Sequence, residues 1–162
     1  MDQLFSTAAR VGALLKSRGD TVAVAESSAG GLISAALLSV PGASAYFIGG
    51  GVIYTGRARH RLLDLGRETV EGIRSASEPY AVLLADTART RLGVTWGLSE
   101  TGAAGPSGNP YGDAAGHACL AVSGPVNLVR TLETGSGDRI GNMTTFAEHA
   151  LALLEDALMA AG

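Results

Sequence analysis

The feature of this sequence that most constrains its fold is an uncharged stretch of thirty residues between Glu26 and Arg57. The stretch is long enough to cross a bilayer, but glycine and proline interrupt it repeatedly. The interruptions fall at Gly30, Gly31, Pro41, Gly42 and Gly49 to Gly51. A membrane helix does not tolerate so many breaks, so we interpret the stretch as buried protein interior made of short elements.

Hydrophobic periodicity predicts helices and strands that alternate along the chain. The expected helices span 3–18, 32–40, 57–65, 68–74, 77–92 and 139–159. The expected strands span 21–25, 46–55, 94–100, 118–122 and 127–133, the last two as a hairpin. Interleaving of this kind favours a three-layer α/β/α fold with a mixed, mostly parallel sheet. The length of 162 residues corresponds to one domain, residues 1–162.

Charge and cysteine content exclude several functions. The net charge is −3 and the pI is about 5.5, which leaves no basic surface typical of nucleic-acid or anionic-membrane binding. A single cysteine, Cys119, allows no internal disulfide, and three separated histidines lack the spacing of metal ligands. No phosphate-loop, dinucleotide or nucleophile-elbow motif occurs. We expect no metal, no cofactor, no nucleic-acid partner and, from the acidic rather than basic first residues, a cytoplasmic protein.

Three loops are expected where strands end, at 26–31, 41–46 and 101–113. In an open α/β sheet, ligands collect beyond the carboxyl ends of strands. Gly30 and Gly31 either present amide groups to a phosphate or simply allow a strand and a helix to pack. Glu26 either binds a cation or a ribose hydroxyl, or caps its own helix. The residues alone leave these alternatives open.

Five sequence blocks together resemble the CinA family, specifically its C-terminal competence-damage-inducible domain. They are AESSAGG (25–31), PGASAYFIGGGVIYTGRARHRLL (41–63), SASEP (75–79), TGAAGPSG (101–108) and SGDR (136–139). The blocks occur in family order along essentially the whole chain, with the stand-alone form of the family as the closer comparison. The resemblance implies an amidohydrolase that converts nicotinamide mononucleotide into nicotinic acid mononucleotide and ammonia.

The resemblance also assigns catalytic positions. The family's nucleophilic serine, its tyrosine ten residues on and its lysine fifteen residues on fall at Ser44, Tyr54 and Arg59. Arginine keeps its proton and cannot replace lysine as a base, so Tyr54 would relay the serine proton while Arg59 stabilises its phenolate. We expect the three side chains to converge on one cleft. The alternatives are a nucleotide-binding protein impaired by the loss of lysine, and a structural subunit acting through oligomerisation.

The substrate-binding positions that the resemblance implies lie in three of the blocks. They are Glu26, Ser27, Ser28, Gly30, Gly31, Gly50, Thr101, Gly102, Gly105 and Pro106. The segment from Gly102 to Gly108 is expected to line the cleft with backbone amide groups. Two departures touch this surface: the usual ESCTGG is ESSAGG here, and a usual lysine-proline pair is Asp113-Ala114. The expected partners are a pyridine nucleotide and further copies of the chain, as a homodimer or a larger homo-oligomer.

Overall fold

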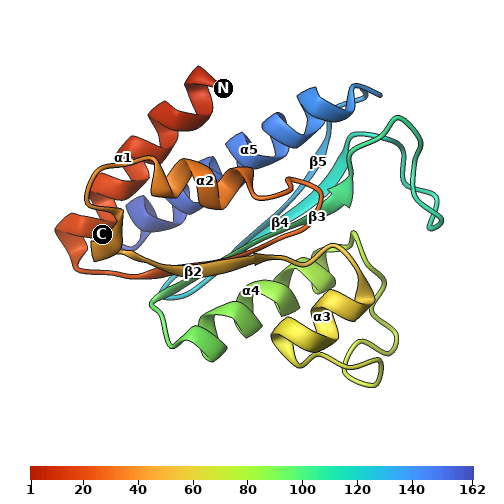
Figure 1. Cartoon of the computed structure of the whole chain (residues 1–162), viewed down its shortest axis with the longest axis horizontal. Coiled ribbons are helices and arrows are strands. Elements are labelled where there is room, and N and C mark those ends of the chain that lie inside the picture. Colours follow the sequence, from red (N-terminus) through yellow and green to blue (C-terminus); the bar gives the residue numbers. More distant parts are fainter.

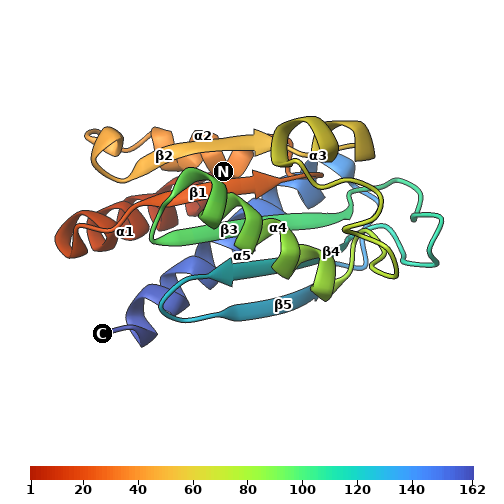
Figure 2. The same ribbon diagram turned by 90° about the horizontal axis from the view of Figure 1, so that it is seen from below.

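A computed structural model describes all of residues 1–162 and contains one five-stranded sheet between two layers of helices (Figure 1). The strand order is β2-β1-β3-β4-β5. The strands are β1 (Val22–Glu26), β2 (Phe47–Val52), β3 (Trp96–Ala103), β4 (His117–Ser123) and β5 (Leu128–Glu133). β1 pairs in parallel with β2 and β3, whereas β4 is antiparallel to both β3 and β5, so only β4 runs against the others (Figure 2). The predicted α/β class and three-layer arrangement are confirmed.

The helices divide between the two faces of the sheet. One face carries α1 (Asp2–Arg18), α2 (Leu32–Leu38) and α5 (Arg139–Ala160), and the other carries α3 (Gly56–Leu63) and α4 (Glu78–Leu92) (Figure 1). A single 3₁₀ turn, η1 (Ala43–Ala45), precedes β2. The predicted ends are confirmed at α1, which stops at left-handed Gly19, and at α4, where the Ser77 hydroxyl accepts a bond from the amide of Tyr80.

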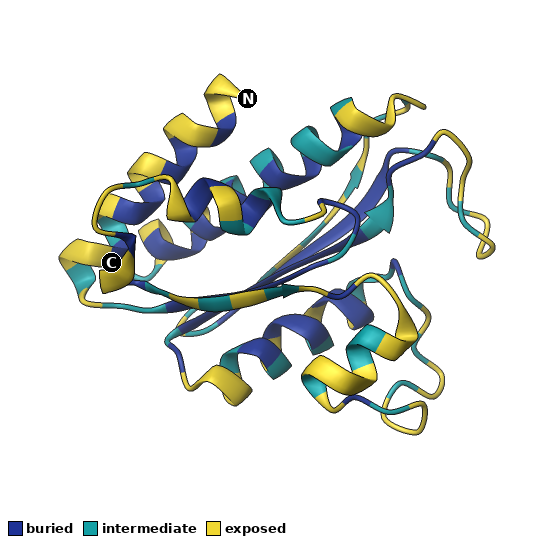
Figure 3. Ribbon diagram, viewed as in Figure 1, coloured by how far each residue is buried: buried dark blue, intermediate teal, exposed yellow.

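The two faces of the sheet bury cores of different size. The larger core, of 26 buried residues, lies against α1, α2 and α5, while a core of 8 residues lies on the α4 side. The alternation of side chains along β1 explains this, because Val22 and Val24 enter the large core whereas Ala23 and Ala25 face α4. β1 and β4 are buried along their length, β3 is buried except at its last two residues, and β2 at the edge is partly exposed (Figure 3).

Small residues let α4 lie directly on the sheet. A Cβ atom added at Gly97 of β3 would come within 2.1 Å of the Ala85 carbonyl oxygen. Next along the same face, the buried Ser99 hydroxyl donates to the Ala81 carbonyl. The backbone of α4 therefore packs directly against β3 at this point.

One predicted element is wrong. Residues 68–74 form successive turns and not a helix. Their amides bond three residues back, as from Thr69 to Gly66 and from Ile73 to Val70. Gly72 has a φ of +77°, in the left-handed region, which is incompatible with a continuing right-handed helix.

The close approach at Gly97 gives a stability prediction. Gly97→Ala should lower the free energy of unfolding by about 1–3 kcal/mol, because a methyl group has no space against the Ala85 carbonyl. Gly66→Ala is the control, since nothing lies within 4 Å of a Cβ there, and its effect should stay within about 0.5 kcal/mol. Urea unfolding of both variants measures the difference, and equal stabilities would contradict the close contact.

Candidate functional site

A pocket of about 360 Å³ opens at the carboxyl ends of β1, β2 and β3. This is the place where parallel strands deliver their following loops to one edge of the sheet. Its walls come from the segments after all three strands and from the start of α4. The lining residues are Ser27, Ile53, Tyr54, Thr55, Gly56, Ser75, Ala76, Tyr80, Thr101, Gly102, Asn109, Pro110 and Tyr111.

Two buried carboxylates fix the wall that follows β1. Glu26 accepts bonds from the amides of Gly31, Ile33 and Ser34, at 2.9–3.1 Å, and from the Ser34 hydroxyl. Its side chain is completely buried. The expectation that Glu26 binds substrate is therefore wrong, because both carboxylate oxygens are used to cap α2. The alternative interpretation, a cap on its own helix, is the one observed.

The second carboxylate, Glu100 of β3, holds the turn just before α2. It accepts bonds from the amides of Ser27 and Ala29, at 2.9 and 2.8 Å, and from the Ser28 hydroxyl. Complete burial raises the pKa of Glu100, and the three donated hydrogen bonds oppose that rise. Ser28 is buried in this contact, so it supports the wall, and Ser27 is the member of the turn that reaches the pocket.

Tyr54 lies in the pocket and contacts an arginine that starts α5. Arg139 donates to the Tyr54 hydroxyl at 3.2 Å and also to the Gly105 carbonyl. Arg139 thus connects the segment after β2 with the loop after β3. The contact between Arg139 and Tyr54 was not predicted from the sequence. Arg139 is the last residue of the SGDR block at 136–139.

Arg59 has a different partner from the expected one. Its Nε donates to the Leu65 carbonyl at 3.1 Å, where it holds the chain beyond the end of α3. The expectation that Arg59 stabilises the Tyr54 phenolate is not met, because Arg139 occupies that position. Arg59 remains close to the pocket, since its Nη2 lies 3.6 Å from where a Cβ of the rim residue Gly56 would be.

Ser44 lies at the other end of β2. It is an exposed residue of η1, which precedes the strand, whereas Tyr54 follows the strand. The only lysine of the chain, Lys16, supports this turn by donating to the Pro41 carbonyl at 2.6 Å. The expected convergence of Ser44 with Tyr54 and Arg59 therefore does not occur within one chain, because the whole of β2 separates them.

The remaining predicted positions divide between the pocket and its support. Thr101 and Gly102 line the pocket, whereas Gly30 and Gly31 begin α2 behind it. Gly50 lies within β2, away from this pocket. Gly102 is the only part of the 102–108 segment on the wall, so the prediction that the whole segment lines the cleft is wrong.

Most of the 102–108 segment lies away from the pocket wall because the loop folds on itself. At Gly108 a Cβ would come within 2.2 Å of the Asp113 carbonyl, and at Gly105 it would meet Ala115 and Gly137. The glycines here allow packing within the loop. The following Pro106, joined to Gly105 by a cis peptide bond, is likewise outside the pocket lining.

A charged network holds the loop after β3 against the segment before α4. Arg74 binds Asp113 through both guanidinium nitrogens, at 2.7 and 3.2 Å. Buried His117 contacts Glu133 through Nδ1 and the Ala76 carbonyl through Nε2, and lies 3.6 Å from Asp113. Asp113 and Ala114 occupy the positions of the lysine-proline pair in the family pattern. In this chain Asp113 has a structural role, because it forms an ion pair with Arg74.

This arrangement defines a class: an α/β protein with a pocket at the carboxyl edge of its sheet. The sequence model described as the CinA C-terminal domain matches residues 4–158. The chain belongs to the CinA family.

Relatives and solved structures agree with this membership. A CinA-like protein of Parasynechococcus marenigrum is 43% identical over 84% of this chain, and one of Chlorobium phaeobacteroides is 41% identical over 91%. The chain spans 32% and 36% of the lengths of these two proteins.

Two crystal structures also superpose on the fold. The competence/damage inducible protein CihA of Agrobacterium tumefaciens has a TM-score of 0.88 at 29% identity, covering 96% of this chain and 95% of its own.

A CinA superfamily protein of Klebsiella pneumoniae has a TM-score of 0.90 at 25% identity, covering 97% of this chain and 98% of its own. No group of three or more histidine, cysteine or acidic side chains is arranged to hold a metal ion. None of the helices combines the length and apolar character needed to span a membrane.

The His117 network predicts a pH dependence of stability. Burial favours neutral imidazole, but the bonds to Glu133 and Ala76 and the charge of Asp113 outweigh it, so the pKa of His117 is raised. A raised histidine pKa gives stability that is complete below about 6.5 and is lost as the pH rises through the folded-state value. His117→Gln should therefore flatten the fall in unfolding free energy between about pH 6 and pH 8.5.

Urea unfolding at both pH values measures this effect, with His149→Gln as the control for a histidine outside the network. A wild-type protein that became more stable across this range, relative to His117→Gln, would contradict the assigned direction.

Proposed function

We propose that this chain hydrolyses the carboxamide of a pyridine nucleotide, with nicotinamide mononucleotide as substrate and nicotinic acid mononucleotide and ammonia as products. Membership of the CinA family supports this proposal. The observation that carries it is the bond that the Arg139 guanidinium donates to the hydroxyl of Tyr54, a residue that lines the pocket at the carboxyl edge. A tyrosine hydroxyl held in place by a donated hydrogen bond is positioned to relay a proton during amide hydrolysis.

The pocket matches the other needs of such a substrate. Its walls combine hydroxyl groups of Ser27, Ser75 and Thr101 with the aromatic rings of Tyr80 and Tyr111. Hydroxyl groups can form hydrogen bonds with a ribose and a carboxamide, and aromatic faces can stack on a pyridinium ring, which is a cation. A serine hydroxyl, Ser44 by family position, is the proposed nucleophile.

A test of the reaction measures ammonia released from nicotinamide mononucleotide. Tyr54→Phe should lower the rate by about 10²–10⁴-fold, because it removes the proton relay and keeps the ring. Arg139→Ala should lower it by about 10²–10³-fold through loss of the cation. Arg130→Ala is the control, because Arg130 pairs with Asp156 on the surface and should leave the rate unchanged. Equal rates in all four proteins would refute the assignment of the pocket.

A nucleotide-binding protein with impaired catalysis is the second candidate, favoured by Arg59. This arginine stands at the position of the family lysine and is engaged with the Leu65 carbonyl. Binding of nicotinamide mononucleotide without release of ammonia by the wild-type protein would select this function over hydrolysis.

Substitution of Arg59 tests whether the lost lysine limits the rate. Arg59→Lys should raise hydrolysis by about 10²-fold, because an amine at the pocket rim can lose its proton and act as a base, which a guanidinium cannot. Arg130→Lys on β5 is the control and should have no effect. A lower rate in Arg59→Lys would show that the guanidinium itself is used.

A further inference from the structure

α3 and the turn after it carry a local cluster of cations. Residues 57–67 hold four of the eleven arginines of the chain and a single acid, Asp64. The acidic net charge gave no sign of this cluster, because most of the acids lie elsewhere in the chain. Together with Gly56 and His60, the four arginines line a pocket of about 440 Å³ that contains no hydrophobic side chain. These four, which we call the α3 arginines, are Arg57, Arg59, Arg61 and Arg67.

Three of the α3 arginines have no partner in the protein. The other eight arginines of the chain each contact a carboxylate or a backbone carbonyl. Arg57, Arg61 and Arg67 form neither a hydrogen bond nor an ion pair. The one acid within this segment, Asp64, lies instead 4.0 Å from Arg91 of α4. The charge of the cluster is therefore not neutralised within the chain.

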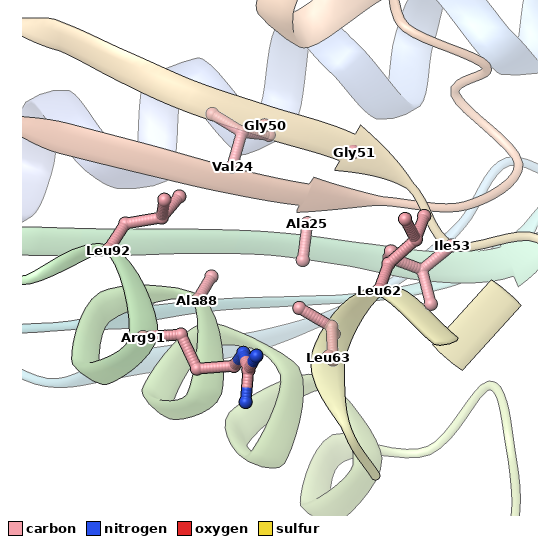
Figure 4. Close-up of a pocket in the computed structure, with 10 residues that line it drawn as sticks. All are labelled: Val24, Ala25, Gly50, Gly51, Ile53, Leu62, Leu63, Ala88, Arg91 and Leu92. Carbon is pink, nitrogen blue, oxygen red and sulfur yellow. The ribbon is translucent and has the colours of Figure 1, made fainter. Parts of the chain in front are cut away.

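The packing of α3 leaves its arginines free. Leu62 and Leu63 line an apolar groove between β2, α3 and α4 (Figure 4). The lining of this groove and the lining of the arginine pocket have no residue in common. Arg57, Arg61 and Arg67 are all exposed. The leucines thus attach the helix to the fold, and the cationic surface is not needed for that contact.

A cluster of unpaired cations destabilises the free protein. Arg57 and Arg61 are four residues apart on one helix, a spacing at which like charges repel. Arg57 also lies in the first turn of α3, at the positive end of the helix dipole, and that turn contains no acid. A bound anion would relieve both effects. Phosphate is well suited to this role, because its oxygens accept paired hydrogen bonds from guanidinium groups.

The arginine pocket adjoins the pocket at the carboxyl edge of the sheet. Gly56 belongs to the walls of both. No lysine, arginine or histidine lines the pocket at the carboxyl edge. Arg139 is not part of that lining and is engaged with the Tyr54 hydroxyl and the Gly105 carbonyl. A nucleotide in the pocket at the carboxyl edge would therefore find unpaired cations for its phosphate on the other side of Gly56.

We propose that the α3 arginines bind a phosphate group, and that this group is the phosphate of the nucleotide whose carboxamide lies in the adjoining pocket. The assignment to the substrate rests on the proposed function, whereas the phosphate site itself does not. The α3 arginines then select a phosphorylated substrate over the corresponding nucleoside.

Binding of inorganic phosphate tests the site without reference to catalysis. Calorimetric titration at low salt should detect binding to the wild-type protein. The affinity should fall about 10-fold or more in Arg57→Gln/Arg61→Gln, because each lost guanidinium removes charge-assisted hydrogen bonds. Arg10→Gln/Arg130→Gln is the matched control, since it removes the same charge from two arginines paired with other acids, and it should bind as the wild type does. A wild-type protein that binds no phosphate, or equal losses in both double variants, would overturn the site.

Comparison with nicotinamide riboside tests the assignment to the substrate. The riboside has the carboxamide, ring and ribose of nicotinamide mononucleotide but lacks its phosphate. The wild-type kcat/KM should be at least about 10-fold higher for the mononucleotide than for the riboside. In Arg57→Gln/Arg61→Gln this ratio should fall toward one through a higher KM for the mononucleotide, because the lost contact acts on binding. A ratio that does not change in the double variant would overturn the assignment.

Displacement of bound phosphate separates this inference from the proposed reaction. If the wild-type protein releases no ammonia, displacement by nicotinamide mononucleotide but not by the riboside would support the site and refute only the hydrolase. Phosphate that the mononucleotide fails to displace would overturn the assignment to the nucleotide.

Discussion

Two buried carboxylates, Glu26 and Glu100, hold the part of the structure on which the site depends. The turn between β1 and α2 presents free backbone amides that have no partner within the helix. Glu26 accepts from the amides at the start of α2, and Glu100 accepts from those of the turn before it. The donors to both buried carboxylates are backbone amides and serine hydroxyls, whose dipoles offset the cost of burying them. Without these acceptors the turn would lose its shape, and Ser27 would lose its place in the pocket.

The sheet then determines which segments meet. The carboxyl ends of β1, β2 and β3 lie at one edge, so the turn held by Glu100, the segment of Tyr54 and the loop after β3 share one pocket. Arg139, from the start of α5, connects two of these segments through Tyr54 and Gly105. The Arg74–Asp113 pair and His117 fix the outer part of the loop. The pocket is therefore assembled from elements far apart in the sequence and held by polar contacts at its rim.

The same topology places the two residues of the proposed catalytic pair at opposite ends of β2. A parallel strand always carries its preceding and following segments to opposite edges of the sheet, so Ser44 and Tyr54 are separated by construction.

The sequence by itself determined the fold class, most element boundaries and the family, because hydrophobic period, caps and glycine positions act locally. It predicted α1, α4 and α5 closely, and it failed at 68–74, where turn bonds and the left-handed Gly72 prevailed over an amphipathic pattern. Only the tertiary structure decided that Glu26 is a cap, that Arg139 rather than Arg59 contacts Tyr54, and that Ser44 lies away from both. Contacts of this kind join residues from different elements, and their geometry is set by strand order and packing, which no local pattern encodes.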